Sequence, residues 1–526
     1  MAEEKPKKSY GFGEEFARVE LGDKRLNKRA VSIAESLGSA CHQSIPEATD
    51  GRAEMEAVYR FANNPRVTAE DLMAAHREMT LERIDKHPVL VMVQDTTEVD
   101  LTRTKGRVKG AGPLSARRVG FFLHHVMAFS EFGTPLGIVK HIVWVRKKIG
   151  TGLTETQRRA AIRRRPIEEK ESRRWLEGLH ACRDVARACP RVKIVCVADS
   201  ESDIYEYLEE ATRLHKEHRL EFIVRSAQNR NVETPDSQDS EESEENEEMA
   251  KLFTYMRSQP VRGSAEVEVS ERRAKTNVEL KSPRKCSREY RRATVQIHTG
   301  QVTLCSPRNR PKGPSIVLNA VLVEEKSPPK GQPPVQWLLL TSLPVDRRED
   351  WEKVIQYYRQ RWYVEIYHRT LKTGCRIEDR YFRTMKAMRV CLALYMVIAW
   401  RLTYLCWLGR ECPDIPCDVV FTETEWKSIY TYIHKKTPPT KPPTLKEMIH
   451  MIAKLGGYKG RASPHPGVET LWRGLQKVPS IAVSWVRGRI SVLKELRKQG
   501  QLSEKEFRKL YRAELKKLTP KHITFY

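Results

Sequence analysis

The sequence lacks three features that would place it in other classes of protein. None of its 11 cysteines forms a CxxC pair, and the closest groupings, at 182–196 and 406–417, do not match zinc-module spacing. We therefore expect buried, reduced thiols. The first residues contain no apolar segment of the kind found in signal peptides. The longest apolar run, 390–400, is shorter than the ~20 residues that cross a bilayer, and predicts a core helix of a cytoplasmic protein.

Positive charge greatly exceeds negative charge. The chain has 94 Lys and Arg against 68 Asp and Glu, a formal net charge of +26. Such an excess favours association with a polyanion, because counterions are released when DNA or RNA binds. Hydrophobic residues make up 40% of the chain, which excludes global disorder. A basic solvated surface would give the same count, but the sign and size of the excess favour nucleic-acid binding.

The negative charge is unevenly distributed. Nine acidic residues fall in the Ser-rich stretch 233–248. We expect this stretch to be a disordered loop. It is either a passive linker or an internal mimic of DNA phosphates that restrains binding. Deleting it and measuring DNA affinity against salt concentration would distinguish the two.

The order of apolar segments predicts a mixed α/β fold. Residues 12–86 have the spacing of helices. Three strands are predicted next, at 89–93, 119–129 and 136–145. A helix at 167–188, a strand at 192–198, a helix at 202–215 and a strand at 221–225 follow. The second and third strands are joined by a turn signal and predict an antiparallel pair. This order favours a mixed sheet flanked by helices.

The second half of the chain interrupts this sheet and then becomes helical. Residues 226–335 predict an inserted all-β subdomain, with strands at 261–270, 293–298, 301–304 and 315–323. Residues 337–341 return to the sheet, and a long helix runs from 348 to at least 372. The remainder is mostly helical, with a Pro-rich break at 437–443. Gly500 separates the last two helices, and Ser503 with Glu506 forms a capping box. We predict an N-terminal helical domain (1–75), a central α/β domain (76–390) and a C-terminal helical domain with a basic tail (391–526).

Two acidic residues follow predicted core strands. Asp95 comes after the run 89–93, and Asp199 comes after 192–198. An unpaired carboxylate near the middle of a core sheet is costly, and a hard divalent cation would offset that cost. Asp199 alone could be a helix cap. Two such residues on central strands are harder to explain in that way, and they predict a metal site.

A third acidic residue lies on the helix 348–372. At about 100° per residue, Tyr358, Arg361, Glu365 and Lys372 fall within an arc of about 60°. A carboxylate between an Arg and a Lys suits a metal ligand flanked by phosphate-binding groups. A solvated face with ion pairs would carry the same charges, but it does not account for the aromatic residues around it. The helix that follows Asp23 is also basic, at Arg25 and Arg29 among others, and is either solvated or bound to DNA.

Taken together, these residues resemble a known family. The pattern Tyr358-x2-Arg361-x3-Glu365-x6-Lys372, with Gln-Asp-Thr-Thr at 94–97 and Asp-Ser-Glu-Ser-Asp-Ile-Tyr at 199–205, is similar to the bacterial DDE transposases of the insertion-sequence-four family, in particular the transposon-five type. The likeness covers most of the chain. Further similar segments lie at 21–25, 57–67, 222–226, 318–323, 337–342 and 452–457.

The resemblance implies an RNase H-like catalytic core with an Asp-Asp-Glu triad formed by Asp95, Asp199 and Glu365. It implies two Mg²⁺ ions, replaceable by Mn²⁺, that serve cleavage and joining of a phosphodiester. It assigns DNA contacts to Tyr358, Arg361, Lys372, Trp337, Arg225, Arg25 and Arg29. Trp337 would stack a flipped base during hairpin formation, although a Trp that opens an apolar strand is more often part of the core.

The function implied is cut-and-paste transposition by a homodimer that holds two transposon ends and target DNA. An inactive DNA-binding inhibitor and a nuclease without strand transfer are the alternatives. One position departs from the family pattern, because Leu26 stands where a relative has Arg. We therefore expect a different end sequence.

Overall fold

The computed structural model describes residues 11–103, 108–146, 165–233, 250–269, 291–307, 313–460 and 465–518. It divides into two compact units. One comprises Met1–Ile84, Thr96–Gly150 and Tyr363–Tyr526, and the other comprises Asp85–Asp95 and Thr151–Trp362. Most of the acidic stretch predicted as a loop, residues 234–248, lies outside the described residues.

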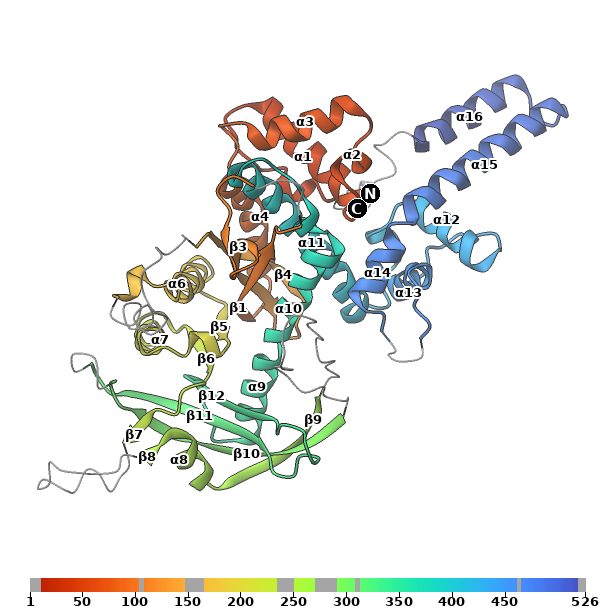
Figure 1. The fold of residues 1–526 in the computed structure, drawn as a ribbon. Helices are drawn as coiled ribbons and strands as arrows, with labels where there is room; N and C mark the ends of the chain where they lie inside the picture. The colour runs from red at the N-terminus through yellow and green to blue at the C-terminus, as the bar shows by residue number, and fades with distance from the viewer. Residues whose placement is uncertain are drawn as a thin grey trace, which may run out of the picture. The chain divides into compact units, whose positions relative to one another are not determined.

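The unit that contains Thr151–Trp362 is built on a mixed sheet (Figure 1). Its strands follow the order β1-β5-β6-β12-β11-β10-β7-β8, with β9 paired to β10. They are β1 (Val89–Asp100), β5 (Lys193–Ala198), β6 (Glu221–Arg225), β7 (Asn231–Glu233), β8 (Ala250–Lys251), β9 (Val261–Val269), β10 (Arg291–Leu304), β11 (Ile316–Glu325) and β12 (Gln336–Thr341). β1, β5 and β6 are parallel, and from β6 onward the pairs are antiparallel. The predicted mixed sheet is confirmed.

Helices connect the parallel strands of this unit. α6 (Arg173–Ala188) and α7 (Tyr205–His218) lead into β5 and β6, and they contact each other. α6 buries Trp175 fully, and α7 buries Tyr207. Both helices occur where the apolar spacing predicts them. Because β1, β5 and β6 are parallel, their carboxyl ends point in the same direction.

The inserted segment differs from the prediction in two ways. The strands expected at 293–298 and 301–304 are one strand, β10, in which Gly300 pairs with Ala320 without interrupting the ladder. A helix, α8 (Leu252–Ser258), precedes β9, and it buries Leu252 and Met256 one turn apart. The insertion is therefore not all-β, and it extends the sheet through β11 and β12 rather than forming a second one.

The predicted helix at 348–372 is interrupted. α9 (Arg348–Arg359) ends at Gln360, whose N–H bonds to the Tyr357 carbonyl 3.1 Å away, three residues back instead of four. α10 (Arg361–Arg369) follows directly, and Thr370–Gly374 forms a π-helical turn, closed by the Cys375 N–H and the Thr370 carbonyl at 2.8 Å. Both irregularities interrupt the regular α-helical spacing, so the continuous helix predicted for 348–372 is wrong, and the common face of Tyr358, Arg361, Glu365 and Lys372 stays a prediction.

In the other unit, helices surround a buried central helix (Figure 1). α11 (Met385–Glu411) packs against α3, α4 and β4 of the same unit. The Trp400 indole N–H donates to the Pro135 carbonyl at 2.9 Å. α11 is long and apolar enough to cross a membrane, but 94% of its most apolar window is buried inside the fold. The core helix predicted from the run 390–400 is therefore confirmed.

The N-terminal part of this unit is helical, as predicted. It comprises η1 (Glu14–Phe16), α1 (Lys24–Ser39), α2 (Ile45–Ala48), α3 (Arg52–Asn63) and α4 (Ala69–Ile84). The strands β2 (Gly112–Pro113), β3 (Val119–Ser130) and β4 (Pro135–Trp144) follow. β3 and β4 form the antiparallel pair expected from the turn between them.

A buried ionic cluster joins η1 to α4. Glu15 accepts from the Arg83 guanidinium at 2.8 Å, and its second oxygen lies 2.6 Å from His76 Nδ1. Burial alone would raise the pKa of Glu15, but His76 and Arg83 together lower it to about 2. Burial has the opposite effect on His76 and lowers its pKa. His76 is therefore neutral at neutral pH, and the charged partner of the Glu15 carboxylate is Arg83.

Arg380 forms hydrogen bonds that connect the N-terminal helices to the segment before α11. Its Nη2 donates to the carbonyl oxygens of Cys41 at 2.6 Å and Cys375 at 2.8 Å, and its Nη1 donates to the Gln43 carbonyl. The residue is 4% exposed. One guanidinium thus satisfies three carbonyl groups from segments more than 300 residues apart in the sequence.

The C-terminal part contains α12 (Glu423–His434), α13 (Leu445–Leu455), α14 (Val468–Leu475), α15 (Val478–Lys498) and α16 (Glu504–Leu518). α15 and α16 pack together as a hairpin (Figure 1). Gly500 adopts φ +71° between them, and the Ser503 hydroxyl and backbone N–H both bond to Glu506. The predicted Gly500 boundary and capping box are confirmed.

Candidate active site and nucleic-acid interface

Asp95 and Asp199 occupy equivalent positions on neighbouring strands. β1 and β5 pair in parallel, and the last recorded pair is Val93 with Val197. Two residues further along both chains stand Asp95, in β1, and Asp199, directly after β5. Neighbouring strands lie about 4.8 Å apart, and residues at the same register point to the same face. The strand register therefore places Asp95 and Asp199 side by side, at the point where β5 ends.

Asp199 also has a local structural role. It is the N-cap of the short helix η3 (Ser200–Ser202), and its Oδ1 accepts from the Glu201 N–H at 2.9 Å. The helix-cap interpretation of Asp199 is thus correct, but it does not exclude a second role. A carboxylate has two oxygens and about four lone-pair positions, so one backbone hydrogen bond leaves capacity for another ligand.

Arg361 approaches the carboxylate pair from α10. Its Nη1 lies 3.6 Å from Asp95 Oδ2, and the two side chains are 18% and 12% exposed. Two neighbouring carboxylates repel each other in a partly dehydrated site, and a guanidinium reduces that repulsion. Arg361 is therefore placed to balance negative charge at this edge, whether the charge belongs to aspartate or to a DNA phosphate.

Tyr358, Trp337 and Arg225 lie beside this pair. The rings of Trp337, in β12, and Tyr358, in α9, are 5.8 Å apart and nearly perpendicular. Arg225, at the end of β6, hydrogen-bonds to Tyr358 and donates to the Gln336 carbonyl at 3.3 Å. Burial raises the pKa of Tyr358, while Arg361 and Arg225 lower it in part and Asp199 raises it. The Tyr358 hydroxyl is therefore protonated at neutral pH and can donate a hydrogen bond.

Glu365 and Lys372 belong to the other unit. Glu365 is half-buried and lies one turn after Arg361 on α10, so both side chains occur on the same face of that helix. Lys372 lies in the π-helical turn, and its Nζ is 3.8 Å from Glu378 Oε1. π-helical turns are frequent at functional sites, because they rotate the following side chains relative to the preceding turn.

The aspartate pair fits a hard divalent cation, since carboxylate oxygens are the ligands that Mg²⁺ and Mn²⁺ prefer. Within the residues that the structure describes, no three His, Cys, Asp or Glu side chains are close enough to hold a metal ion. Asp95 and Asp199 are therefore two candidate ligands, placed at the same register of neighbouring strands. The described residues place no third metal ligand beside this pair.

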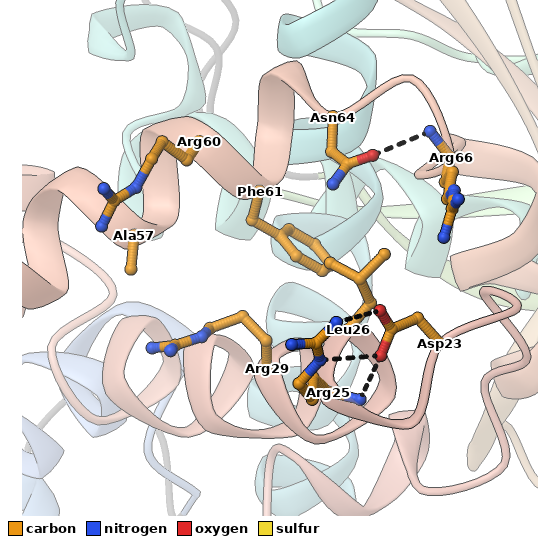
Figure 2. Close-up of a pocket in the computed structure, with 9 residues that line it drawn as sticks. All are labelled: Asp23, Arg25, Leu26, Arg29, Ala57, Arg60, Phe61, Asn64 and Arg66. Atoms are coloured by element: carbon orange, nitrogen blue, oxygen red, sulfur yellow. Dashed lines mark hydrogen bonds and ion pairs between the residues drawn. The ribbon is translucent and has the colours of Figure 1, made fainter.

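A second site lies between α1 and α3, where the structure places Arg25 and Arg29. Both line a cavity of about 360 Å³ (Figure 2). The other lining residues are Asp23, Leu26, Ala57, Arg60, Phe61, Asn64 and Arg66. Arg60 and Arg66 were missed in the sequence. A positive charge at each end of the similar segment 57–67 was the available signal, but only the packing of α3 on α1 gathers four arginines in one place.

The charges of this cavity are only partly balanced. Arg25 turns back on Asp23, with Nη2 at 3.2 Å from Oδ2 (Figure 2). The guanidinium groups of Arg29, Arg60 and Arg66 form no salt bridge with any residue in the described ranges. All three are exposed. The cavity therefore carries an excess of positive charge suited to phosphate.

Comparison with known proteins links these features. Residues 12–67 match a family model described as transposase DNA-binding, residues 151–401 match the transposase DDE domain, and residues 397–491 match the transposase Tn5 dimerisation domain. The three matches together cover most of the chain. The first includes all nine residues of the α1–α3 cavity, and the second includes Asp199 and Glu365. Asp95 lies outside the second, so its pairing with Asp199 rests on strand register.

A solved structure described as "Cryo-EM structure of piggyBac transposase synaptic complex with hairpin DNA (SNHP)" is also similar. The match has 11% identity, covers 94% of this chain and 76% of that chain, and has a TM-score of 0.33. A score this low supports no conclusion about activity. The family models do, and they confirm the RNase H-like mixed α/β core expected from the sequence. The chain belongs to the DDE transposases of the Tn5 type, DNA-binding enzymes with a catalytic DDE domain and a dimerisation domain.

Proposed function

We propose that this transposase binds specific transposon ends, cleaves them through a hairpin intermediate and joins them to target DNA. The observation that carries the proposal is the register of Asp95 with Asp199, with Arg361 3.6 Å from Asp95. Two carboxylates and a guanidinium at one sheet edge suit phosphoryl transfer, which needs charge neutralisation and positioning rather than a protein nucleophile.

Asp95, Asp199 and Glu365 are the proposed metal ligands. Glu365 is the third because it belongs to the pattern of Tyr358, Arg361, Glu365 and Lys372 that resembles the family's, and the matched DDE domain covers it. When bound, two Mg²⁺ or Mn²⁺ ions would activate a water or a DNA 3′-hydroxyl for in-line attack on a phosphodiester. A DDE domain supports divalent-metal catalysis, and the number and identity of the ions are part of the proposal.

The neighbouring side chains would position the DNA. Arg361 and Lys372 would hold phosphate oxygens, and the protonated Tyr358 hydroxyl would donate a hydrogen bond to the same backbone. Arg225 already orients Tyr358 and would reach the strand that folds back. Trp337 is half-buried, with its ring against Tyr358, which leaves part of the indole for stacking on an unpaired base.

Two copies of the chain would act together. The matched dimerisation domain supports a homodimer, and two ends held in one synaptic complex would allow coupled joining. Arg25 and Arg29 in the α1–α3 cavity would contact transposon ends. The matched DNA-binding model covers this region and supports DNA contact, whereas preference for particular ends is the finer proposal.

A gel assay tests the function. Labelled inverted repeats found beside the coding sequence are incubated with the full chain, Mg²⁺ and supercoiled target. We expect hairpin-ended fragments and strand-transfer products. Simple double-strand cuts without joining would identify a nuclease, and shifted but uncut DNA would identify a DNA-binding inhibitor. Either result contradicts the proposal.

A further inference from the structure

The α1–α3 cavity has an arrangement that a purely phosphate-binding surface does not need. Its floor is apolar, formed by Leu26, Ala57 and Phe61. Phe61 is 3% exposed and Ala57 9%, whereas Leu26 is half-buried and contributes the accessible part of the floor. Three of its four arginines stand at its ends, and Arg25 lies beside Leu26, paired with Asp23. Figure 2 shows Arg29 and Arg60 extending toward one end, with Arg66 at the other and Leu26 between them.

This order of groups, basic at both ends and apolar between, suits the edge of a base pair flanked by phosphates. Guanidinium groups at two ends suit successive or opposite backbone phosphates, and the middle offers a hydrocarbon surface with no hydrogen-bonding side chain on the floor. In the DNA major groove, the group that seeks an apolar contact is the 5-methyl of thymine. Side chains near the start of a helix are well placed to contact base edges there, and Leu26 is the third residue of α1.

We propose that Leu26 reads the 5-methyl group of one thymine in the transposon end, while Arg29, Arg60 and Arg66 hold the flanking phosphates. The proposal rests on specific end binding as proposed above, and it names the base class that this cavity selects. Asp23 strengthens the selectivity, because it pairs with the Arg25 guanidinium by two contacts, at 3.4 Å and 3.2 Å, and so occupies donors that could otherwise reach a base. An arginine reaching the floor would instead favour guanine, through its O6 and N7 acceptors.

The methyl group can be removed without changing base pairing. Each thymine of the end duplex is replaced singly by deoxyuridine, and binding of the full chain is measured at fixed salt concentration. Burying one methyl group predicts about a three- to five-fold weaker Kd at one position. The same scan with Leu26→Ala should show no sensitive position. Lys28→Ala is the matched control, since Lys28 is exposed on the same helix outside the cavity, and the sensitive position should persist.

The outcomes separate this inference from the proposed function. A preference for the end over a scrambled duplex, with uniform affinity across the uracil series, overturns the thymine proposal and leaves end recognition standing. A sensitive position that persists unchanged in Leu26→Ala also overturns it. Equal binding to end and scrambled duplexes overturns both. The scan on the unmodified protein is informative by itself, so the test does not depend on how well a variant folds.

Discussion

Arg361 Nη1 lies 3.6 Å from Asp95 Oδ2, so the first carboxylate of the proposed site has a guanidinium partner before DNA is present. The positive charge of Arg361 at this distance reduces the repulsion between Asp95 and Asp199. The same contact also means that Arg361 can exchange an aspartate for a phosphate once cations and DNA bind. This single residue would therefore serve the free enzyme and the DNA complex in different ways.

The aspartate pair is the first target for substitution. Asp95→Asn or Asp199→Asn should lower cleavage of a labelled end by at least about a thousandfold, since loss of a metal ligand removes several kcal/mol of transition-state stabilisation. End binding in a mobility-shift assay should change by less than about threefold, roughly 0.6 kcal/mol. Glu201→Gln is the control, because Glu201 is exposed and pairs with Arg174. Cleavage by either Asp variant near the unmodified rate would remove that residue from the triad.

Arg361 should be sensitive to shape as well as to charge. Arg361→Lys keeps the positive charge but loses the planar donors that bind an oxygen pair, and we expect cleavage to fall about ten- to a hundredfold. Arg359→Lys, on the neighbouring exposed position, should leave the rate unchanged. Single-turnover rates at saturating protein measure the effect. Equal losses in both variants would mean that the 3.6 Å contact has no special role.

The contact between Trp337 and Tyr358 predicts a step-specific defect. Trp337→Ala should reduce hairpin products about tenfold, because stacking on an unpaired base contributes about 1–3 kcal/mol. First-strand nicking should be much less affected. Trp337→Phe, which retains a ring, should recover part of the hairpin yield. If nicking and hairpin formation fall together, Trp337 serves the core of the sheet rather than the DNA.

The buried cluster around Glu15 predicts acid sensitivity. The pKa of Glu15 is lowered from 4.5 to about 2, so its charged form stabilises the folded state above about pH 4.5. This contribution, about 3 kcal/mol at most, is lost as the pH falls from about 4.5 toward 2. Chemical denaturation of the unmodified chain and Glu15→Gln should give free energies of unfolding that converge over this range. Parallel curves would show that Glu15 does not carry the effect.

Much of the fold could be predicted because local patterns encode it. The runs before Asp95 and Asp199 are continuous and apolar, as buried parallel strands require, and both strands form where predicted. Their register could not be predicted, because it depends on pairing between segments about a hundred residues apart. The interruption of the predicted helix at Gln360 could not be predicted from the sequence either, because Gln is a good helix former and the backbone angles of Gln360 remain helical.

The residues proposed to contact DNA were likewise predictable only in part. Arg361 and Tyr358 were predicted by helical spacing, and the structure places both beside the aspartate pair. Arg60 and Arg66 lie on a segment whose spacing indicates only a helix and a turn. Their relation to Arg29 arises from the packing of two helices, and a sequence of local patterns carries no information about which exposed arginines will share a cavity.

The bonds of Arg380 to the carbonyls of Cys41 and Gln43 have a consequence for engineering. They connect the N-terminal helices to a residue more than 300 positions downstream. The N-terminal region is therefore not an independent DNA-binding module. A chimera that exchanges the whole region between relatives would leave an arginine, 4% exposed here, facing foreign carbonyl groups. Retargeting should instead graft only the outward side chains of α1 and α3 and leave their supports in place.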